Sequence, residues 1–348
     1  MKTFFQILLI AIPVALIGSF VGLSPVWLFF LSALGIIPLA KYIGEATEEL
    51  STRSNTAVGG FLNATFGNAT ELIISIIALH AGLIDVVKAS ITGSILGNLL
   101  LVLGMSMFAG GLIHKKQTFN TTAARAHAST LLLALTSLVI PAIFLYTAPA
   151  TPNRIIENMS IFVAIAMIVV YAGNLFFSLR THKHLYAEEV AKYEPKWSIQ
   201  KSVTVLLTSA VFISLLSEIL VQSLEPSIAI LHWSQLFVGV VVLAIIGNIA
   251  EHTSAITVAL KNRMDLSLQI ALGSATQMAV FIAPLLVIIS AFFQYKMNLI
   301  FNIFELVAII LSIFIANSVV EDGESNWLEG LQLMTAYVII AVAFFFYS

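Results

Sequence analysis

The chain has no cysteine and few charged residues: 16 Lys and Arg together with 18 Asp and Glu make up only 10% of its 348 positions. Soluble domains carry about 25% charged residues. Without cysteine there are no disulfide bonds and no thiolate metal sites, although the redox compartment stays open. With a formal net charge of −2 there is also no basic patch that could bind nucleic acid. These shortages exclude a disulfide scaffold and a nucleic-acid-binding protein.

Apolar sequence takes the place of the missing charge. Hydrophobic residues make up 59% of the chain, and the mean hydropathy is +1.01. Apolar runs of about 20 residues each predict a membrane-spanning helix, and eleven such runs follow one another with short linkers. They lie at 4–21, 25–44, 57–80, 86–112, 122–147, 155–180, 199–223, 234–260, 266–293, 299–319 and 327–347. The predicted fold class is therefore an all-α polytopic membrane protein with eleven transmembrane helices.

The first run resembles a secretory signal peptide, because Lys2 precedes it and the small residues Gly18 and Ser19 lie near its end. We expect it to remain as the first transmembrane helix, because the distribution of lysine and arginine between the loops agrees best with the positive-inside rule when this helix is present.

The loop lysines and arginines predict the orientation of the chain in the membrane. With the N-terminus in the cytoplasm, 13 of the 16 basic residues fall on the inner side, and Lys88, Arg154 and Lys296 fall on the outer side. The positive-inside rule therefore predicts a cytoplasmic N-terminus and a C-terminus outside.

Short motifs recur at an offset of 180 residues. Gly67-Asn68-Ala69-Thr70-Glu71 in the third run matches Gly247-Asn248-Ile249-Ala250-Glu251 in the eighth. The offset also relates Val58-Gly59 to Val238-Gly239, Asp85 to Asp265, and Gly93-Ser94 to Gly273-Ser274. Because five spans separate the two copies, the second copy crosses the membrane in the opposite sense. Inverted repeats of this kind place their substrate sites near the membrane midplane.

The repeat divides the chain into one leading helix and two halves of five helices, a 1 + (5+5) arrangement. We place the first transmembrane helix at 1–24 and the first five-helix repeat at 25–181. A cytoplasmic linker at 182–198 then precedes the second, inverted five-helix repeat at 199–348. No soluble domain fits between the helices.

Each repeat carries a glutamate inside an apolar run. An ionisable side chain at membrane depth costs about 2.5–3.5 kcal/mol and marks a functional site by default. Asn68 and Glu71 are three residues apart, as are Asn248 and Glu251, so each pair shares one helix face. The glycine before each asparagine permits a helix break that frees a backbone carbonyl. Two such pairs in matched contexts indicate one shared site.

The helix after each glutamate carries a polar stripe, Gly93-Ser94-Ile95-Leu96-Gly97-Asn98 in one repeat and Gly273-Ser274-Ala275-Thr276-Gln277 in the other. Carboxylate, amide and hydroxyl oxygens are hard ligands; Ca²⁺ takes about 6–8 of them, whereas zinc or copper favours nitrogen or sulfur. The candidate Ca²⁺ ligands are Glu71, Glu251, Asn68, Asn248, Ser94, Ser274 and Gln277.

Two facing carboxylates in a low dielectric cannot both stay ionised cheaply without a cation. Protons and a divalent cation then compete for the same oxygens. A site that binds either one or the other is the simplest requirement for a cation/proton antiporter. The alternative is that Glu71 and Glu251 belong to a structural hydrogen-bonded network, while stripe glycines such as Gly93 and Gly273 serve helix packing.

Several other polar side chains lie in the apolar runs. His252 follows Glu251 but points about 100° around the helix, so it is either a proton relay or a packed histidine. Glu218 is either a second carboxylate on the ion path or a locally paired group near an interface. Asn98 is a further candidate for the ion path or gate, and we expect Glu305 to be structural.

At these motifs the chain resembles the cation/calcium exchangers, in particular bacterial members of the calcium/proton (CAX) branch. The two Gly-Asn-x-x-Glu phrases and the two polar stripes carry the resemblance, which extends over essentially the whole chain. It implies a calcium site between the third and eighth helices, with Glu71 and Glu251 as the exchanging carboxylates. It also implies that the second and seventh helices, which carry Pro38 and Glu218, slide to alternate access.

The chain departs from that family pattern in two places. Many relatives carry Ser where this chain has Gly97, which weakens a ligand role at that position. The acidic segment expected after the sixth helix is reduced to Glu188, Glu189 and Glu194, so regulation through it is doubtful.

Together the residues and the resemblance predict a secondary active transporter that exports Ca²⁺ in exchange for H⁺. It would be no enzyme and hold no cofactor, and its partners would be Ca²⁺, H⁺, membrane lipid and copies of itself, with a trimer assumed. Short termini favour the bacterial plasma membrane.

The nearest alternative is a Na⁺/Ca²⁺ exchanger, whose expected extra acidic and Ser/Thr-rich signatures these repeats lack. A passive cation channel fits less well without a pore-lining ring, and Glu251-His252 is not a two-histidine protease motif.

Overall fold

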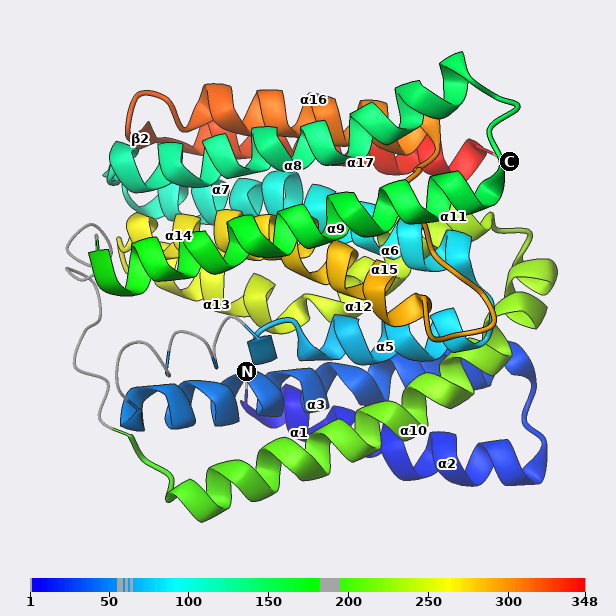
Figure 1. Cartoon of the computed structure of the whole chain (residues 1–348). Helices are drawn as coiled ribbons and strands as arrows, with labels where there is room; N and C mark the ends of the chain where they lie inside the picture. The colour runs from blue at the N-terminus through cyan, green and yellow to red at the C-terminus, as the bar shows by residue number, and fades with distance from the viewer. Residues whose placement is uncertain (1, 55–58, 60–61, 63–64, 182–194, 348) are drawn as a thin grey trace.

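The computed structural model describes residues 2–54, 59, 62, 65–181 and 195–347, nearly all of them in helices that run along one common direction (Figure 1). Val58 and linker residues 182–194, which include the three acidic residues named above, lie outside the described residues. The expectations for these residues stay predictions.

The described helices of the first half follow the predicted apolar runs. The label η marks stretches with the wider turns of a π-helix. The elements are α1 (Lys2–Leu8), α2 (Ala11–Val21), α3 (Pro25–Arg53), α5 (Ala69–His80), α6 (Ile84–Leu96), η1 (Gly97–Val102), α7 (Leu103–Ile113), β1 (Gln117–Thr118), α8 (Thr121–Thr147), α9 (Asn153–Phe176) and η2 (Phe177–Thr181).

The second half follows its predicted runs in the same way. Its elements are α10 (Ile199–Leu231), α11 (Gln235–Phe237), η4 (Val238–Leu243), α12 (Ala244–Gly247), α13 (Ile249–Ala259), α14 (Met264–Gln277), η5 (Met278–Ile282), α15 (Ala283–Ser290), α16 (Ile303–Val319), β2 (Glu324–Ser325) and α17 (Trp327–Phe346).

Two short strands correct the all-α prediction in a small way. β1 and β2 pair antiparallel, with Gln117 opposite Ser325. A salt bridge between Lys116 and Glu324 lies beside them. The strands therefore join two loops at one end of the molecule and leave the helical architecture unchanged.

Eight of the described helices are long and apolar enough to cross a membrane, and the bent pair Gln235–Gly247 and Ile249–Ala259 would make a ninth. The helices α5 and α16 are apolar but shorter. A largely helical polytopic membrane protein is therefore supported, while the count of eleven spans and their direction stay predictions.

Helix boundaries recur at the same offset as the sequence motifs. α5 corresponds to α13, α6 to α14, η1 to η5 and α7 to α15. In the second half the π-helical stretch begins directly after the polar stripe, and in the first half it begins within the stripe, at Gly97. The local structure therefore repeats together with the sequence.

The repeat helices occupy the middle of the molecule. In Figure 1, α2, α3 and α10 form one side and α8, α16 and α17 the other, with α5 and α12 to α15 between them. In the most apolar stretch of Ile84–Ile113, 72% of the residues are buried, against 22% in Asn153–Thr181. The polar stripes thus lie on the helices that are best shielded from the surroundings.

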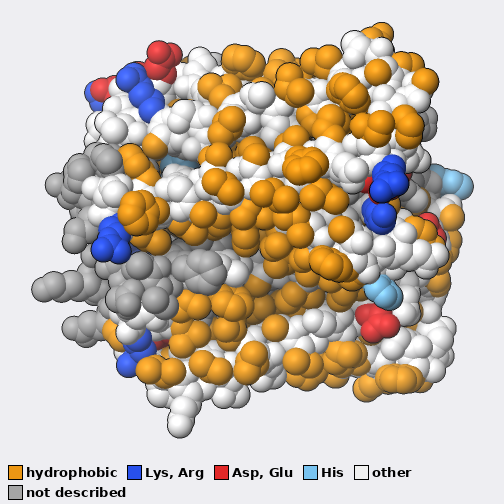
Figure 2. Space-filling model, in the orientation of Figure 1, with side chains coloured by type: hydrophobic (Ala, Val, Ile, Leu, Met, Phe, Trp, Pro, Cys, Tyr) orange, Lys and Arg blue, Asp and Glu red, His pale blue; other side chains and the backbone are white. Residues whose placement is uncertain are grey.

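The surface carries a broad apolar band. Figure 2 shows hydrophobic side chains over the middle of one face, with Lys, Arg, Asp and Glu gathered toward the two ends of the helices. An apolar belt bounded by charged ends is the pattern that a bilayer requires.

The helices α3 and α10 form an extended pair. Their contact is close at Gly35, where an added Cβ would lie 2.8 Å from Leu216 Cδ1. At one end of the pair, the buried Glu49 carboxylate accepts hydrogen bonds from the backbone N–H groups of Lys196 (3.2 Å) and Trp197 (3.0 Å). The end of α3 is therefore tied to the segment that leads into α10.

Candidate cation-binding site

The two glutamates occupy equivalent positions at the start of half-helices. Asn68 is the N-cap of α5 and Asn248 that of α13, and their backbone angles are alike (φ −103°, ψ 29° and φ −94°, ψ 12°). Glu71 and Glu251 are each the third residue of their helix, where the helix dipole favours a negative charge. The helix bends by 60° at Asn248, in agreement with the break predicted at the glycine before it.

Neither N-cap asparagine caps its own helix through its side chain. Asn68 instead reaches α14, where its Nδ2 donates to Gln277 Oε1 (2.6 Å) and its Oδ1 accepts from Ser274 Oγ (3.1 Å). Amides committed to each other in this way hold their orientation, because a buried unpaired polar atom costs free energy.

The second asparagine makes the matching contact with the other repeat. Asn248 Nδ2 donates to Ser94 Oγ (2.9 Å) and to the Ala244 carbonyl (2.8 Å). Asn98 joins the two halves, because its Nδ2 donates to Asn248 Oδ1 (3.1 Å) and to Ser274 Oγ (3.0 Å). One hydrogen-bonded network, which we call the amide network, therefore contains Asn68, Ser94, Asn98, Asn248, Ser274 and Gln277.

The amide network departs from the repeat symmetry at one place. Gly97 and Gln277 are related by the offset, as are Asn98 and Met278. The first repeat thus supplies its amide one residue later than the second. Nothing lies within 4 Å of a Cβ added at Gly97, so the space beside the network stays open there.

The two glutamates each follow a network asparagine by three residues, and three of their four carboxylate oxygens are buried without a donor among the described residues. Glu71 is 3% exposed, and neither of its carboxylate oxygens accepts a hydrogen bond from the described residues; the same is true of Glu251 Oε2 and Asn98 Oδ1. The Glu71 side chain lies against Gly247 of the other repeat, where an added Cβ would meet its Cγ at 2.9 Å. Buried acceptors without donors call for a cation or a proton.

The donor set is oxygen-rich. Among the described residues no group of three or more His, Cys, Asp or Glu side chains is placed so that it could hold a metal ion. What surrounds the carboxylate pair is amide and hydroxyl oxygen, the ligand type of a hard cation such as Ca²⁺. All seven candidate ligands thus gather on α5, α6, α13 and α14 or at the ends of these helices, while their role as ligands stays a prediction.

Two histidines lie near the site. His252 is buried on α13, and its Nε2 has no hydrogen-bond partner among the described residues. His127 of α8 lies behind the polar stripe of α14, with its Nδ1 3.5 Å from Thr276 Oγ1. His127 was not among the predicted site residues, and its only signal in the sequence was an imidazole within the apolar run at 122–147.

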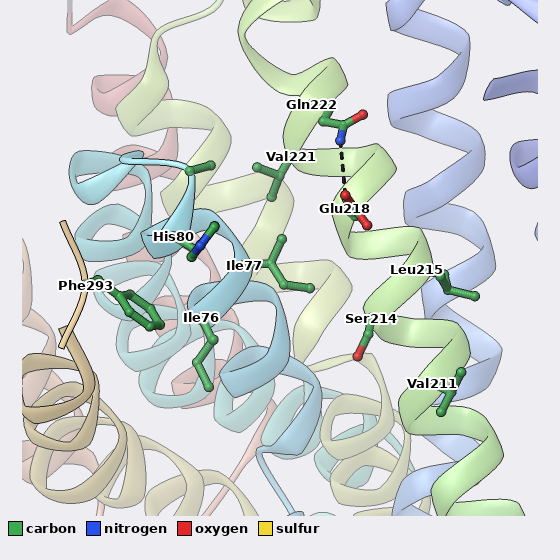
Figure 3. Close-up of a pocket in the computed structure, with 11 residues that line it drawn as sticks. Ile76, Ile77, His80, Val211, Ser214, Leu215, Glu218, Val221, Gln222 and Phe293 are labelled. Carbon is green, nitrogen blue, oxygen red and sulfur yellow. Dashed lines mark hydrogen bonds between the residues drawn. The ribbon is translucent and has the colours of Figure 1, made fainter. Parts of the chain in front are cut away.

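The remaining predicted residues lie apart from the amide network. Pro38 is buried inside α3. Glu218 of α10 is exposed and lies beside Ile76, Ile77 and His80 (Figure 3). These three residues project from the face of α5 opposite Glu71, because they follow it by 5, 6 and 9 positions in a helix of 3.6 residues per turn. Glu218 is therefore not brought to the amide network.

Glu305 has a local role. Its carboxylate accepts from the backbone N–H of Asn302 (2.9 Å), closing a capping box at the start of α16, and from Thr92 Oγ1 (3.1 Å). Nearby, Lys88 Nζ donates to the Ile300 carbonyl (2.7 Å). These contacts fasten the loop before α16 to α6, as expected for a structural glutamate.

Comparison with known proteins identifies the family. The model of the sodium/calcium exchanger protein family matches residues 24–180 and 201–346. The chain is 44% identical to a Ca²⁺/H⁺ antiporter of Synechocystis sp. over 361 residues, which cover 99% of this chain and 97% of that protein. It is 43% identical to the Ca²⁺/H⁺ antiporter ChaA of Bacillus subtilis (strain 168) over 350 residues, 99% of either chain.

Solved structures agree with this assignment. The structure of native YfkE superposes with a TM-score of 0.87 at 42% identity and covers 98% of this chain and 99% of that one. The H⁺/Ca²⁺ exchanger CAX, at 14% identity and a TM-score of 0.71, covers 99% of this chain and 92% of that one, and shows a shared fold. The chain therefore belongs to the sodium/calcium exchanger family, a family of transporters rather than enzymes, and lies among its CAX-like bacterial antiporters.

Proposed function

We propose that the protein exports Ca²⁺ from the cytoplasm in exchange for H⁺ by alternating access. The observation that carries this proposal is the pair of glutamates, Glu71 and Glu251, each three residues after an asparagine of the amide network. Glu71 is buried, and both of its carboxylate oxygens and Glu251 Oε2 lack donors among the described residues. Relatives at 43–44% identity bear the name Ca²⁺/H⁺ antiporter, which supports the choice of substrates.

The two loaded states differ in what neutralises the carboxylates. Ca²⁺ would take oxygens of Glu71 and Glu251 together with amide and hydroxyl oxygens of Asn68, Asn248, Ser94, Ser274 and Gln277. With Ca²⁺ gone, protons would neutralise the glutamates, because two bare carboxylates in a low dielectric repel each other. The helices would change the side to which the site is open only when the two carboxylates are neutralised. This condition would couple the Ca²⁺ flux to the H⁺ flux.

The amide network would hold the site in a geometry that can accept either Ca²⁺ or protons. The Nδ2 groups of Asn68, Asn98 and Asn248 donate within the network. Their amide oxygens are thereby held in place as acceptors, and Asn98 Oδ1 is buried with no donor among the described residues. We propose that Asn98 lies on the ion path next to the ligands, and that His252 relays protons from behind Glu251.

The membrane arrangement follows from the same proposal. Eleven spans in a 1 + (5+5) inverted repeat would place both glutamates near the midplane, with the N-terminus in the cytoplasm and the C-terminus outside. The pair of α3 and α10, with Pro38 in α3, would slide against the remaining helices to alternate access. We place the protein in a bacterial plasma membrane, with a trimer as the assumed assembly.

The energy source is the proton gradient. Moving Ca²⁺ outward against an inside-negative potential costs about 4.6 kcal/mol per 100 mV, at about 2.3 kcal/mol per elementary charge. Two protons per Ca²⁺ would make the cycle electroneutral and three would make it electrogenic.

Proton flux in proteoliposomes on addition of Ca²⁺ tests the proposal, with pH and membrane potential clamped separately. We expect Ca²⁺-driven proton movement that is indifferent to Na⁺ and falls to background in Glu71→Gln and Glu251→Gln. Glu225→Gln, a change at an exposed carboxylate of α10, serves as the matched control. Calcium movement that requires Na⁺ would favour a Na⁺/Ca²⁺ exchanger, and calcium movement without protons would favour a passive channel.

A further inference from the structure

A groove of about 530 Å³ opens between α5 and α10 (Figure 3), and the proposed exchange makes no use of it. This volume lies within the range of about 300–1,000 Å³ that is usual for small-molecule sites. Its walls include Ile76, Ile77 and His80 of α5 and Val211, Leu215 and Glu218 of α10.

The groove has an apolar end and a polar end. Along α10, Val211 and Leu215 lie toward one end with 58% and 42% of their surface exposed, and Glu218 and Gln222 lie toward the other (Figure 3). His80, on the opposite wall, is the last residue of α5. In the proposed topology, in which a membrane span ends with α5, the polar end would lie near the membrane boundary and the apolar end toward the hydrocarbon.

Among the described residues that line the groove, Glu218 is the only acidic side chain, and there is no lysine or arginine. Among the described residues its hydrogen-bond partner is Gln222, whose Nε2 lies 3.3 Å from Glu218 Oε1. A carboxylate on a membrane-facing helix is costly unless a cation or a strong donor accompanies it. The groove is thus suited to an occupant with a positive head and an apolar body.

We infer that this groove binds a phospholipid with a primary ammonium headgroup, of the phosphatidylethanolamine type. The ammonium group would donate hydrogen bonds to the Glu218 carboxylate, and an acyl chain would lie along Val211 and Leu215. A primary ammonium carries three N–H donors, whereas the quaternary head of phosphatidylcholine carries none. A soluble cation would leave the apolar end empty. In the proposed topology the site belongs to the outer leaflet.

The bound lipid would touch both α5, which carries Glu71, and α10, one of the helices proposed to slide. A ligand that contacts two elements in only one of their arrangements shifts the equilibrium toward that arrangement. This effect on transport rests on the proposed function, whereas the binding itself does not.

Native mass spectrometry of the purified full chain in detergent, with equal amounts of phosphatidylethanolamine and phosphatidylcholine, tests the site. We expect the wild-type chain to retain phosphatidylethanolamine with about a tenfold preference, equivalent to about 1.4 kcal/mol. Glu218→Gln should abolish the preference, and Glu225→Gln, on the same helix outside the groove, should keep it. Size-exclusion profiles matching that of the wild type would establish that the variants are folded.

A second pair of variants tests the apolar end. Leu215→Trp fills the groove and should lower the retention of both lipids at least threefold, while Leu207→Trp, at an exposed position of α10 outside the groove, should not.

Equal retention of both lipids by the wild type would overturn the inference, as would a second copy of the chain retained in place of lipid. Glu218→Gln with unchanged lipid preference but a raised KM for Ca²⁺ would assign Glu218 to the ion path instead. Loss of transport with lipid selectivity intact would bear on the proposed function alone.

Discussion

At the scale of single residues, Asn98 joins the two halves of the site. Its Nδ2 donates to Asn248 of the other repeat and to Ser274, while its Oδ1 is buried with no donor among the described residues. One side chain therefore orients two candidate ligands and offers a third oxygen next to them.

Replacement of Asn98 by alanine should cost both stability and affinity. Asn248 Oδ1 would lose this donor, and a buried acceptor left unsatisfied costs about 1–3 kcal/mol. Thermal unfolding in detergent should show a lower Tm, and Ca²⁺ uptake should show a KM raised about tenfold, equivalent to about 1.4 kcal/mol. Asn153→Ala, at an exposed asparagine, is the control. A wild-type KM and Tm for Asn98→Ala would remove Asn98 from the site.

The sequence predicts which residues share a helix face, and it does not predict which faces meet. The spacing of Asn68 and Glu71 was enough to group them. The bond between Asn98 and Asn248 joins residues 150 positions apart and depends on how α6 and α13 cross. The same limit explains Glu218, because a carboxylate in an apolar run carries no sign of whether its helix face looks toward the amide network or away from it.

At the scale of helices, two glycines allow α6 and η4 to pack in direct backbone contact. A Cβ added at Gly93 would lie 2.1 Å from the Val240 carbonyl oxygen, and one added at Gly239 would lie 2.4 Å from Ala89 Cβ. Gly93 therefore serves helix packing, whereas Gly273, at the matched position, has only His127 Cε1 nearby, at 3.8 Å.

The variant Gly93→Ala should destabilise the protein, while Gly97→Ala on the same membrane span should not. The methyl group at Gly93 collides with backbone, which costs about 1–3 kcal/mol and outweighs the gain of at most about 1 kcal/mol in helix propensity. At Gly97 no atom lies within 4 Å of the added Cβ, so only the gain remains. Tm values in one detergent decide the matter, and equal Tm shifts for the two variants would contradict the packing role.

The apolar runs predicted where helices lie better than where they end. The run at 25–44 continues as α3 to Arg53, and that at 199–223 continues as α10 to Leu231. The added turns of α3 include Glu45, Glu48 and Glu49, which hydropathy counts against a membrane span. Glu49 is accommodated there by hydrogen bonds from the backbone of Lys196 and Trp197. The 60° bend at Asn248 is equally invisible to hydropathy, because the run continues through it.

At the scale of the whole molecule, charged residues lie toward the ends of the helices and the apolar band lies between them (Figure 2). The uneven share of lysine and arginine between the two ends predicts the orientation in the membrane. Because the chain has no cysteine, single cysteines introduced at the two ends report this orientation without background labelling.

The variant Lys296→Cys should react with a membrane-impermeant maleimide on intact cells, and Lys116→Cys should react only after lysis. Both lysines form exposed ion pairs, with Glu157 and Glu324 respectively. Such pairs are worth about 0–1 kcal/mol, so neither change should disturb the fold. The reverse labelling pattern would invert the proposed topology.

The mismatch of the repeats at Gly97 and Gln277 has an energetic consequence. In the proposed inverted repeat, two identical halves would make the inward-open and outward-open forms equivalent by a two-fold rotation about an axis in the membrane plane, with the same free energy. The inward-open and outward-open forms would then be equally populated at rest. The Gln277 amide, matched in the other half only by open space at Gly97, is one of the differences that would remove that degeneracy. In the proposed transport cycle one form would then be the resting form, and the half-saturating Ca²⁺ concentrations at the two faces of the membrane would differ. The direction of net flux would still be set by the gradients alone.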